Sequence, residues 1–216
     1  MRKYSLISMI LYKEELSVSE QKRKNLPWHS LFKVFAVMLL IAFVMPVVGG
    51  ISAADAAPES GKLIVYYSWS GNTRYVAEQI QYLTGADIFE LKPVDPYPED
   101  FRATAERGRH ELDSGYLPPL VGGIDNLADY EVIFIGFPNW FGTLAIPLFT
   151  FLESYDLSGK TIVPFISHGR GGLQNTLTDL KALAPNSTFL EELAIYRRET
   201  TQSDISQWLD RIGMLK

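Results

Sequence analysis

The sequence of 216 residues predicts an α/β protein in which helices cover both faces of a parallel sheet. From residue 62 onward, strand-like and helix-like segments alternate five times, which favours parallel strands joined by right-handed crossovers. The most apolar segment after residue 56, residues 132–137, reads Val-Ile-Phe-Ile-Gly-Phe. Continuous apolar runs are typical of parallel strands buried on both faces, so this segment is predicted to lie at the centre of the sheet.

The first 56 residues are predicted to be a signal peptide or an N-terminal membrane anchor. A basic stretch leads into an apolar run at residues 34–48, which is shorter than the roughly 20 residues that a transmembrane helix needs. Small residues follow and offer cleavage before Ala57 or before Asp55. Residues 31–51 give a longer apolar segment, so a retained anchor is the alternative. In both cases this segment is expected to engage the membrane or the export machinery, and the protein is expected to be exported, to the periplasm or the exterior.

Residues 57–216 are expected to form a single acidic domain. They hold 13 Lys and Arg residues against 21 Asp and Glu residues, a net charge of −8. Such a domain, without a basic stripe, has no electrostatic attraction for nucleic acid, so that class of partner is excluded. The chain has no cysteine, which excludes disulfides and thiolate chemistry, and its three histidines show no metal-binding spacing.

The first predicted strand, residues 63–67, runs into a loop rich in hydroxyl groups. This first loop consists of Ser68, Trp69, Ser70, Gly71, Asn72 and Thr73. An amphipathic helix follows, with apolar residues at helical spacing from Val76 to Leu83. The N–H groups at a helix start attract anions, hydroxyl groups add further donors, and a glycine lets the backbone approach a ligand closely. An ordinary helix cap needs only one such residue, so we expect a phosphate site.

The next segments are more polar. Residues 87–91 are predicted to form a strand at the sheet edge, and residues 92–98 hold three prolines and are expected to be irregular. Residues 99–114 have only a thin apolar stripe. We therefore expect a surface helix there, with its many charges facing solvent.

A second loop follows the central strand, and its residues are Pro138, Asn139, Trp140, Phe141 and Gly142. A helix with one apolar face is predicted beyond it, up to Tyr155, and then a strand at residues 161–166. Pro164 lies inside this strand and cannot donate a ladder hydrogen bond. The strand is therefore expected to carry a bulge or to have an unpaired side at that residue.

A third loop contains Ser167, His168, Gly169, Arg170, Gly171 and Gly172. A helix up to Ala184 and a last strand at residues 192–196 come next. The closing helix repeats apolar residues from Ile205 to Ile212, and Ser203 is predicted to cap it.

The three loops are expected to meet, because ligands of open α/β sheets bind beyond the carboxyl ends of the strands. The first loop suits a phosphate. Trp140 and Phe141 would each, taken alone, more simply cap the core, but beside a phosphate loop they look like walls for a flat ring. The glycines of the third loop let its backbone approach the edge of a ligand. Together these features describe a site for flavin mononucleotide (FMN).

The same loops resemble those of the flavodoxin-like family over most of residues 61–212. The first loop matches the family motif S/T-x-S/T-G-N-T, and the second matches a Pro-x-Trp-Trp-Gly-like loop of a bacterial branch. The stretch from Phe151 to Lys160 matches that branch as well. Its third loop usually reads His-Gly-Gly-Ser-Gly, and Arg170 is the departure here. The resemblance implies a doubly wound, three-layered fold with a five-stranded parallel sheet in the order 2-1-3-4-5.

The resemblance also implies roles for the loop residues. The phosphate would be held by Ser68, Ser70, Asn72 and Thr73 together with the N–H groups of the loop around Gly71. Trp69 and Trp140 would flank the isoalloxazine ring or the ribityl chain, and the loop from Asn139 to Gly142 would approach N5. The pyrimidine side would be bordered by Ser167, His168, Gly169, Arg170 and Gly171.

These expectations describe an exported FMN-binding redox protein, either an electron carrier or a small flavin-dependent reductase. Its partner would be a redox protein or a small electron acceptor such as a quinone. The alternative is a binding module that has the same fold but no flavin and no redox activity. Histidine side chains often act as proton donors, which would suit His168, but a hydrogen bond that orders the loop is the simpler expectation.

Overall fold

The computed structural model describes residues 61–197 and 199–215. The predicted export segment, with its two cleavage positions and the apolar residues 31–51, lies outside the described residues. Within the described part of the chain, no helix combines the length and the apolarity needed to cross a bilayer.

The sheet is parallel, and its strand order is β2-β1-β3-β4-β5, as the resemblance implies. Along the chain, the first four strands of the sheet are β1 (Lys62–Tyr66), β2 (Asp87–Glu90), β3 (Val132–Pro138) and β4 (Thr161–His168). The three strands β1, β3 and β4 are almost entirely buried, which fits their continuous apolar sequences. The doubly wound α/β fold is confirmed, with the most apolar strand in the middle of the sheet.

Two short strands share the fifth position of the sheet. β5 (Thr188–Phe189) pairs with the start of β4, and β6 (Leu193–Tyr196) pairs with its end. The gap between them falls opposite Val163 and Pro164, which have no partner on that side. The Leu190 N–H donates to the Ile162 carbonyl at 3.0 Å, so even-numbered residues of β4 point their backbone groups toward the gap. The missing N–H of Pro164 therefore faces the gap, which confirms the predicted unpaired side, while the register with β3 continues without a bulge.

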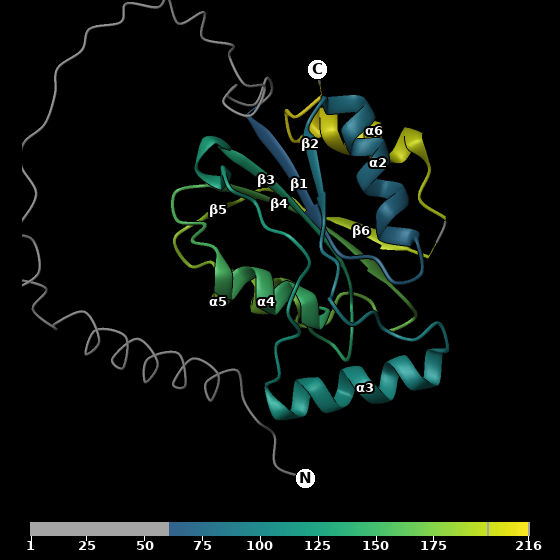
Figure 1. The fold of residues 1–216 in the computed structure, drawn as a ribbon. Helices are drawn as coiled ribbons and strands as arrows, with labels where there is room; N and C mark the ends of the chain where they lie inside the picture. The colour runs from purple at the N-terminus through teal and green to yellow at the C-terminus, as the bar shows by residue number, and fades with distance from the viewer. Residues whose placement is uncertain (1–60, 198, 216) are drawn as a thin grey trace, which may run out of the picture. The chain divides into compact units, whose positions relative to one another are not determined.

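Four helices cover the two faces of the sheet (Figure 1). α2 (Asn72–Thr84) and α6 (Gln202–Arg211) lie on one face, and α4 (Ile146–Ser154) and α5 (Thr176–Leu183) lie on the other. The largest residue of the α2–α6 side is Trp208, which is fully buried against Phe134 with ring centroids 6.3 Å apart. A short 3₁₀ helix, Leu127–Asp129, precedes β3.

Gly136 of β3 is a packing requirement of this sheet. It pairs with Phe165 of β4, and a Cβ atom on residue 136 would lie 2.1 Å from the Phe165 ring. No side chain fits at that distance, so the glycine lets the aromatic ring lie directly over the neighbouring strand.

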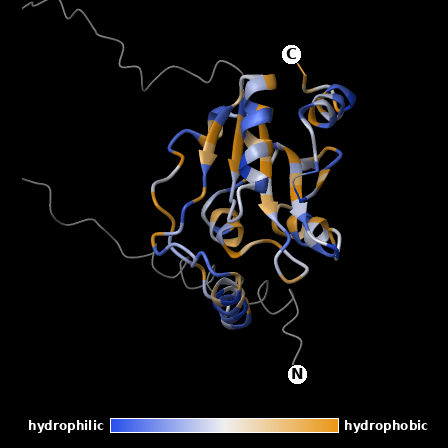
Figure 2. Ribbon diagram, turned by 90° about the vertical axis from the view of Figure 1, so that its right-hand side faces the viewer, coloured by the Kyte–Doolittle hydropathy of each residue, from blue (hydrophilic) through white to orange (hydrophobic). Residues whose placement is uncertain are grey.

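α3 (Phe101–Ser114) packs on neither face of the sheet. It lies beyond the carboxyl ends of the strands, at the bottom of Figure 1, and Figure 2 shows it as mostly hydrophilic. The sequence predicted this surface helix, with a start two residues earlier. The expectation that its charges all face solvent is wrong for Glu111, which is only 4 % exposed.

The cap of α6 also differs from the prediction. Thr201, not Ser203, is the N-cap: its hydroxyl accepts the Asp204 N–H, and the Asp204 carboxylate accepts the Thr201 N–H in return. This reciprocal pair is a capping box with Asp in the place of Glu. Ser203 lies inside the first turn and accepts a hydrogen bond from the Gln207 amide at 3.1 Å.

Candidate functional site

Three loops meet at the carboxyl edge of the sheet. They follow β1, β3 and β4, which are neighbours in the sheet and run in the same direction. They contain the predicted first, second and third loops, except that Pro138 ends β3, Ser167 and His168 end β4, and Asn72 and Thr73 begin α2. The predicted meeting of the three loops is therefore what the topology produces.

The first loop leads into a helix start whose N-cap residue has no side chain. Gly71 is the N-cap of α2, with φ of 84°, and it has no side chain to satisfy the first N–H groups. The first turn holds no acidic residue, while Arg74 contributes a guanidinium that pairs with Glu90. The Ser68 hydroxyl accepts the Arg74 N–H at 3.2 Å, and Ser70 is exposed. An anion such as a phosphate monoester fits this arrangement, because the helix dipole is not neutralised by a carboxylate.

Thr73 links the first loop to the third. Its hydroxyl lies 2.9 Å from the Ser167 hydroxyl, and the two residues are only 1 % and 5 % exposed. A phosphate would share the Thr73 hydroxyl with Ser167. That this side chain contacts the phosphate remains a prediction, and what the structure adds is a buried bond between two of the three loops.

Asn139 links the second loop to the third. Its amide nitrogen donates to the Gly172 carbonyl at 2.7 Å and to the Leu173 carbonyl at 3.2 Å. Its amide oxygen accepts the Gly142 N–H at 3.0 Å. This side chain therefore shapes its own loop as well as joining the two, while the neighbouring Pro138 ends β3 in register with Ser167.

The tip of the second loop has an unusual backbone. Phe141 and Gly142 both have positive φ angles, 59° and 89°. A β-branched residue would be strained in either position. Phe141 is 37 % exposed, and the Arg109 guanidinium lies 4.3 Å from the centroid of its ring. The loop thus presents one aromatic ring to the solvent and turns the other, Trp140, toward the protein.

The third loop is the most exposed of the three. Gly169, Arg170 and Gly171 face solvent, and no interaction is recorded for the Arg170 side chain among the described residues. The His168 Nδ1 lies 2.8 Å from the Gly169 carbonyl and donates to it in the Nδ1–H tautomer. The expected loop-ordering hydrogen bond of His168 is thereby confirmed.

Aromatic side chains gather around Trp140. Tyr67, at the end of β1, and Tyr97, from the irregular segment before α3, both meet the Trp140 ring edge-on, with ring centroids 5.5 and 4.9 Å away. Trp69 lies at the start of α3, where its ring centroid is 6.2 Å from that of Phe101 and its N–H donates to the Pro98 carbonyl at 2.8 Å. The two tryptophans predicted to flank a ring therefore both lie beside α3.

A family model described as flavodoxin matches residues 61–212. The chain belongs to the flavodoxin family. Its predicted resemblance to that family, drawn from the loop motifs and the alternation of strands and helices, is confirmed. No curated protein matches the chain significantly.

Solved structures of similar fold come from several bacteria. A candidate flavoprotein from Bacteroides eggerthii has 30 % identity and a TM-score of 0.63, covering 70 % of this chain and 97 % of that one. One from Bacteroides uniformis has 27 % identity and a TM-score of 0.63, covering 69 % and 97 %. A flavoprotein from Lactobacillus acidophilus, solved in complex with FMN, has 22 % identity and a TM-score of 0.57, covering 70 % and 97 %; at this identity the likeness shows the fold alone.

Sequence reasoning missed part of this flavodoxin-family site. Tyr97, Arg107 and Glu111 form a buried cluster next to Trp140, although the segments that carry them were expected to be irregular or solvated. Burial raises the pKa of Tyr97, and the hydrogen bond to Glu111 raises it further. Burial also raises the pKa of Tyr67, so both phenols stay protonated at neutral pH. The i, i+4 spacing of Arg107 and Glu111 was the available signal, but it is equally common on exposed helices.

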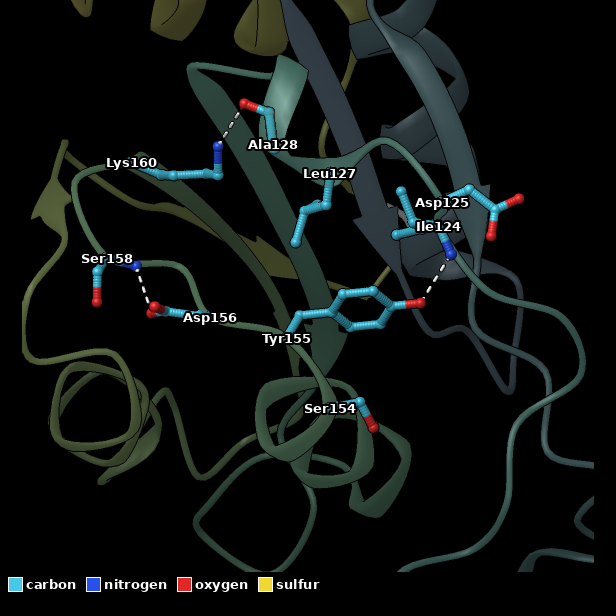
Figure 3. A pocket seen from close by; sticks show the side chains of 9 residues that line it. All are labelled: Ile124, Asp125, Leu127, Ala128, Ser154, Tyr155, Asp156, Ser158 and Lys160. Carbon is cyan, nitrogen blue, oxygen red and sulfur yellow. Dashed lines mark hydrogen bonds between the residues drawn. The ribbon is translucent and has the colours of Figure 1, made fainter. Parts of the chain in front are cut away.

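A hollow of about 470 Å³ opens at the opposite, amino edge of the sheet (Figure 3). Its lining includes Tyr155, whose hydroxyl accepts the Ile124 N–H at 2.7 Å, and Lys160, whose ammonium donates to the Ala128 carbonyl at 3.1 Å. These residues precede β3 and β4, so the hollow is separate from the three loops. The polar groups of Tyr155 and Lys160 are thus occupied by backbone atoms.

Proposed function

We propose that the protein is an FMN-binding redox protein, acting as an electron carrier or as a small flavin-dependent reductase. The observation that carries the proposal is the start of α2 at Gly71, an N-cap without a side chain, at the same sheet edge as Trp140 and the glycine-rich third loop. Membership of the flavodoxin family supports it. So does the FMN complex of the Lactobacillus acidophilus flavoprotein, which has the same fold.

The residues divide into three roles in this proposal. Ser68, Ser70, Asn72 and Thr73 would bind the phosphate, together with the N–H groups around Gly71. Trp69 and Trp140 would flank the ring system or the ribityl chain, and the second loop would approach the ring. The third loop, with Arg170 as its cation, would border the pyrimidine side. Bound FMN would supply the electron transfer, and these residues would supply position and charge.

The cellular setting of the proposal follows from the sequence before residue 57. A basic stretch, an apolar run and small residues support export. The proposed partner of the exported protein is a redox protein or a small electron acceptor such as a quinone. Expression in a bacterial host followed by fractionation and N-terminal sequencing tests this. Recovery of the uncleaved chain in the soluble cytoplasmic fraction would contradict export.

Cofactor identity is the first experiment. The purified protein is expected to be yellow, to show flavin absorption, and to release FMN on denaturation. Colourless protein that takes up no added FMN would overturn the proposal and leave a binding module without flavin.

The phosphate role is tested by comparing FMN with riboflavin, which lacks the phosphate. A hydrogen bond to a charged group contributes about 1.5–3 kcal/mol, so Ser70→Ala is expected to weaken FMN binding by roughly 10- to 100-fold. Riboflavin affinity should not change. The matched control is Ser158→Ala, an exposed serine at the amino edge of the sheet, which should alter neither affinity. Equal losses for FMN and riboflavin in Ser70→Ala would remove the phosphate from the first loop.

A further inference from the structure

α3 packs closely against the second loop at Gly108. Gly108 is buried in the middle of α3, and a Cβ atom there would lie 3.2 Å from Phe141 Cε2 and 3.4 Å from two atoms of the Trp140 ring. Carbon atoms normally keep a larger separation, so even an alanine would force the rings to move by a few tenths of an ångström. The absence of a side chain at Gly108 is what lets α3 close over the two aromatic rings.

A second contact to Trp140 comes from Tyr97. The two rings are perpendicular, at 86°, with centroids 4.9 Å apart, and Tyr97 is only 8 % exposed. Such edge-to-face pairs stabilise a defined mutual orientation beyond the gain from burial alone. Tyr67 meets Trp140 in the same way from β1, at 85°. The indole ring is therefore fixed by two tyrosines that come from different parts of the chain.

Tyr97 is itself held in place by polar contacts from α3. Its hydroxyl donates to the Glu111 carboxylate, and the Arg107 guanidinium lies 4.4 Å from the centroid of its ring. Arg107 also donates to Glu111 at 2.8 Å and to the carbonyls of Pro96 and Asp95 at 3.1 and 2.9 Å. A buried carboxylate is costly unless it is paired, and here both the phenol and the guanidinium satisfy it.

The contacts of Tyr97, Arg107 and Glu111 join α3 to the loops at the carboxyl edge of the sheet. α3 packs on neither face of the sheet and contacts α4 among the covering helices, so the cluster lies at the carboxyl edge, where the Tyr97 ring also lies 6.0 Å from the Tyr67 ring between centroids. The cluster connects α3 to the second loop, whose Trp140 is proposed, together with Trp69 of the first loop, to flank the flavin. We propose that Tyr97, fixed by Arg107 and Glu111, is a positioning residue of the flavin site that holds the Trp140 ring in its binding orientation before the ligand arrives. This inference rests on the proposed function.

The consequence for binding is specific to the ring system. A side chain that must be ordered on binding weakens the affinity by a few-fold, so Tyr97→Leu is expected to raise the Kd by about three- to tenfold. Because Tyr97 acts on Trp140 and not on the first loop, FMN and riboflavin should lose the same factor. A role in the phosphate site would instead affect FMN alone.

The experiment measures FMN and riboflavin affinity of the full chain by fluorescence titration. The conservative variant Tyr97→Phe keeps the ring and should restore most of the affinity. The matched control is Tyr82→Leu, the same change at a tyrosine of α2 that is 78 % exposed, and it should bind both ligands as the parent does. Trp fluorescence of the ligand-free protein should change in Tyr97→Leu and not in Tyr82→Leu.

Gly108→Ala provides an independent variant in case Tyr97→Leu fails to fold. It displaces Trp140 from the side of α3 and should weaken both ligands by a similar few-fold factor. Unchanged affinities in Tyr97→Leu and Gly108→Ala, or a loss confined to FMN, would overturn the inference and leave the proposed function intact. Failure of the parent protein to bind either flavin would instead overturn the proposed function, and this inference with it.

Discussion

The α2–α6 side of the sheet and the loops at its carboxyl edge are held together by different forces. On the α2–α6 side, side chains such as Phe134, Val163 and Trp208 are fully excluded from solvent and pack as one apolar cluster. At the carboxyl edge the loops are joined by polar bonds, from Thr73 to Ser167 and from Asn139 to the third loop. Burial is non-directional, whereas hydrogen bonds fix the relative positions of small groups.

This difference implies that stability and ligand affinity are separable over most of the molecule. Substitutions in the apolar cluster should lower the free energy of unfolding without changing a folded site. Substitutions of the polar links between loops should change both, because the same bonds determine the loop positions. α2 belongs to both regions, since its apolar face is in the cluster and its first turn continues the first loop, which is proposed to bind the phosphate.

The largest effect is expected for Trp208→Ala. Truncating a fully buried tryptophan removes apolar contacts and leaves a cavity, which costs about 3–5 kcal/mol of unfolding free energy. Chemical denaturation measures the loss. FMN affinity of the folded variant, determined well below its melting temperature, should match that of the parent.

Trp208→Phe is the graded control for this prediction. It retains most of the ring but loses the N–H that donates to the Glu191 carbonyl at 3.0 Å, so a smaller loss is expected. A folded Trp208→Ala protein with much weaker FMN binding would show that the two regions are coupled after all.

A smaller effect on stability, but one that extends to binding, is expected for Ser167→Ala. The change leaves the buried Thr73 hydroxyl without its partner, and an unsatisfied buried group costs about 1–3 kcal/mol. FMN affinity should fall together with stability. In the double variant Thr73→Val with Ser167→Ala no hydroxyl is left unpaired, so its loss of stability should be less than the sum of the two single losses.

Much of this molecule could be predicted from local patterns. The strand that ends at Tyr66 and the central strand from Val132 were identifiable because buried parallel strands need continuous apolar residues. The first loop was identifiable because Gly71 and its hydroxyl neighbours exceed what a helix cap requires, and the structure places Gly71, which has no side chain, at the N-cap of α2. Pro164 predicted a bulge or an unpaired side because proline has no N–H to donate, and the structure shows the unpaired side.

The position of α3 could not be predicted, because its sequence carries no information about what lies beside it. Glu111 looks like an exposed charge, and it becomes buried only because Tyr97 and Arg107 reach it from another turn and another segment. The division of the last strand into β5 and β6 likewise depends on the neighbouring strand β4, because Pro164 of β4 interrupts the pairing. Contacts between segments that are distant in the chain could therefore not be predicted from this single sequence.

The smallest effect is expected at the start of α6, where Thr201 is the N-cap in place of the predicted Ser203. Loss of a capping side chain costs about 1 kcal/mol, so Thr201→Ala should lower stability by that amount, while Ser203→Ala should stay within about 0.5 kcal/mol of the parent.

Hydrogen bonds from Thr201 lower the pKa of Asp204. The contribution of the capping box is therefore fully present above the ordinary Asp pKa of about 4 and is lost as the pH falls through the lowered value. The stability difference between the parent and Thr201→Ala should shrink over that acidic range. Because α6 belongs to the apolar cluster, neither variant should alter FMN affinity, and a larger loss for Ser203→Ala than for Thr201→Ala would reverse the assignment of the cap.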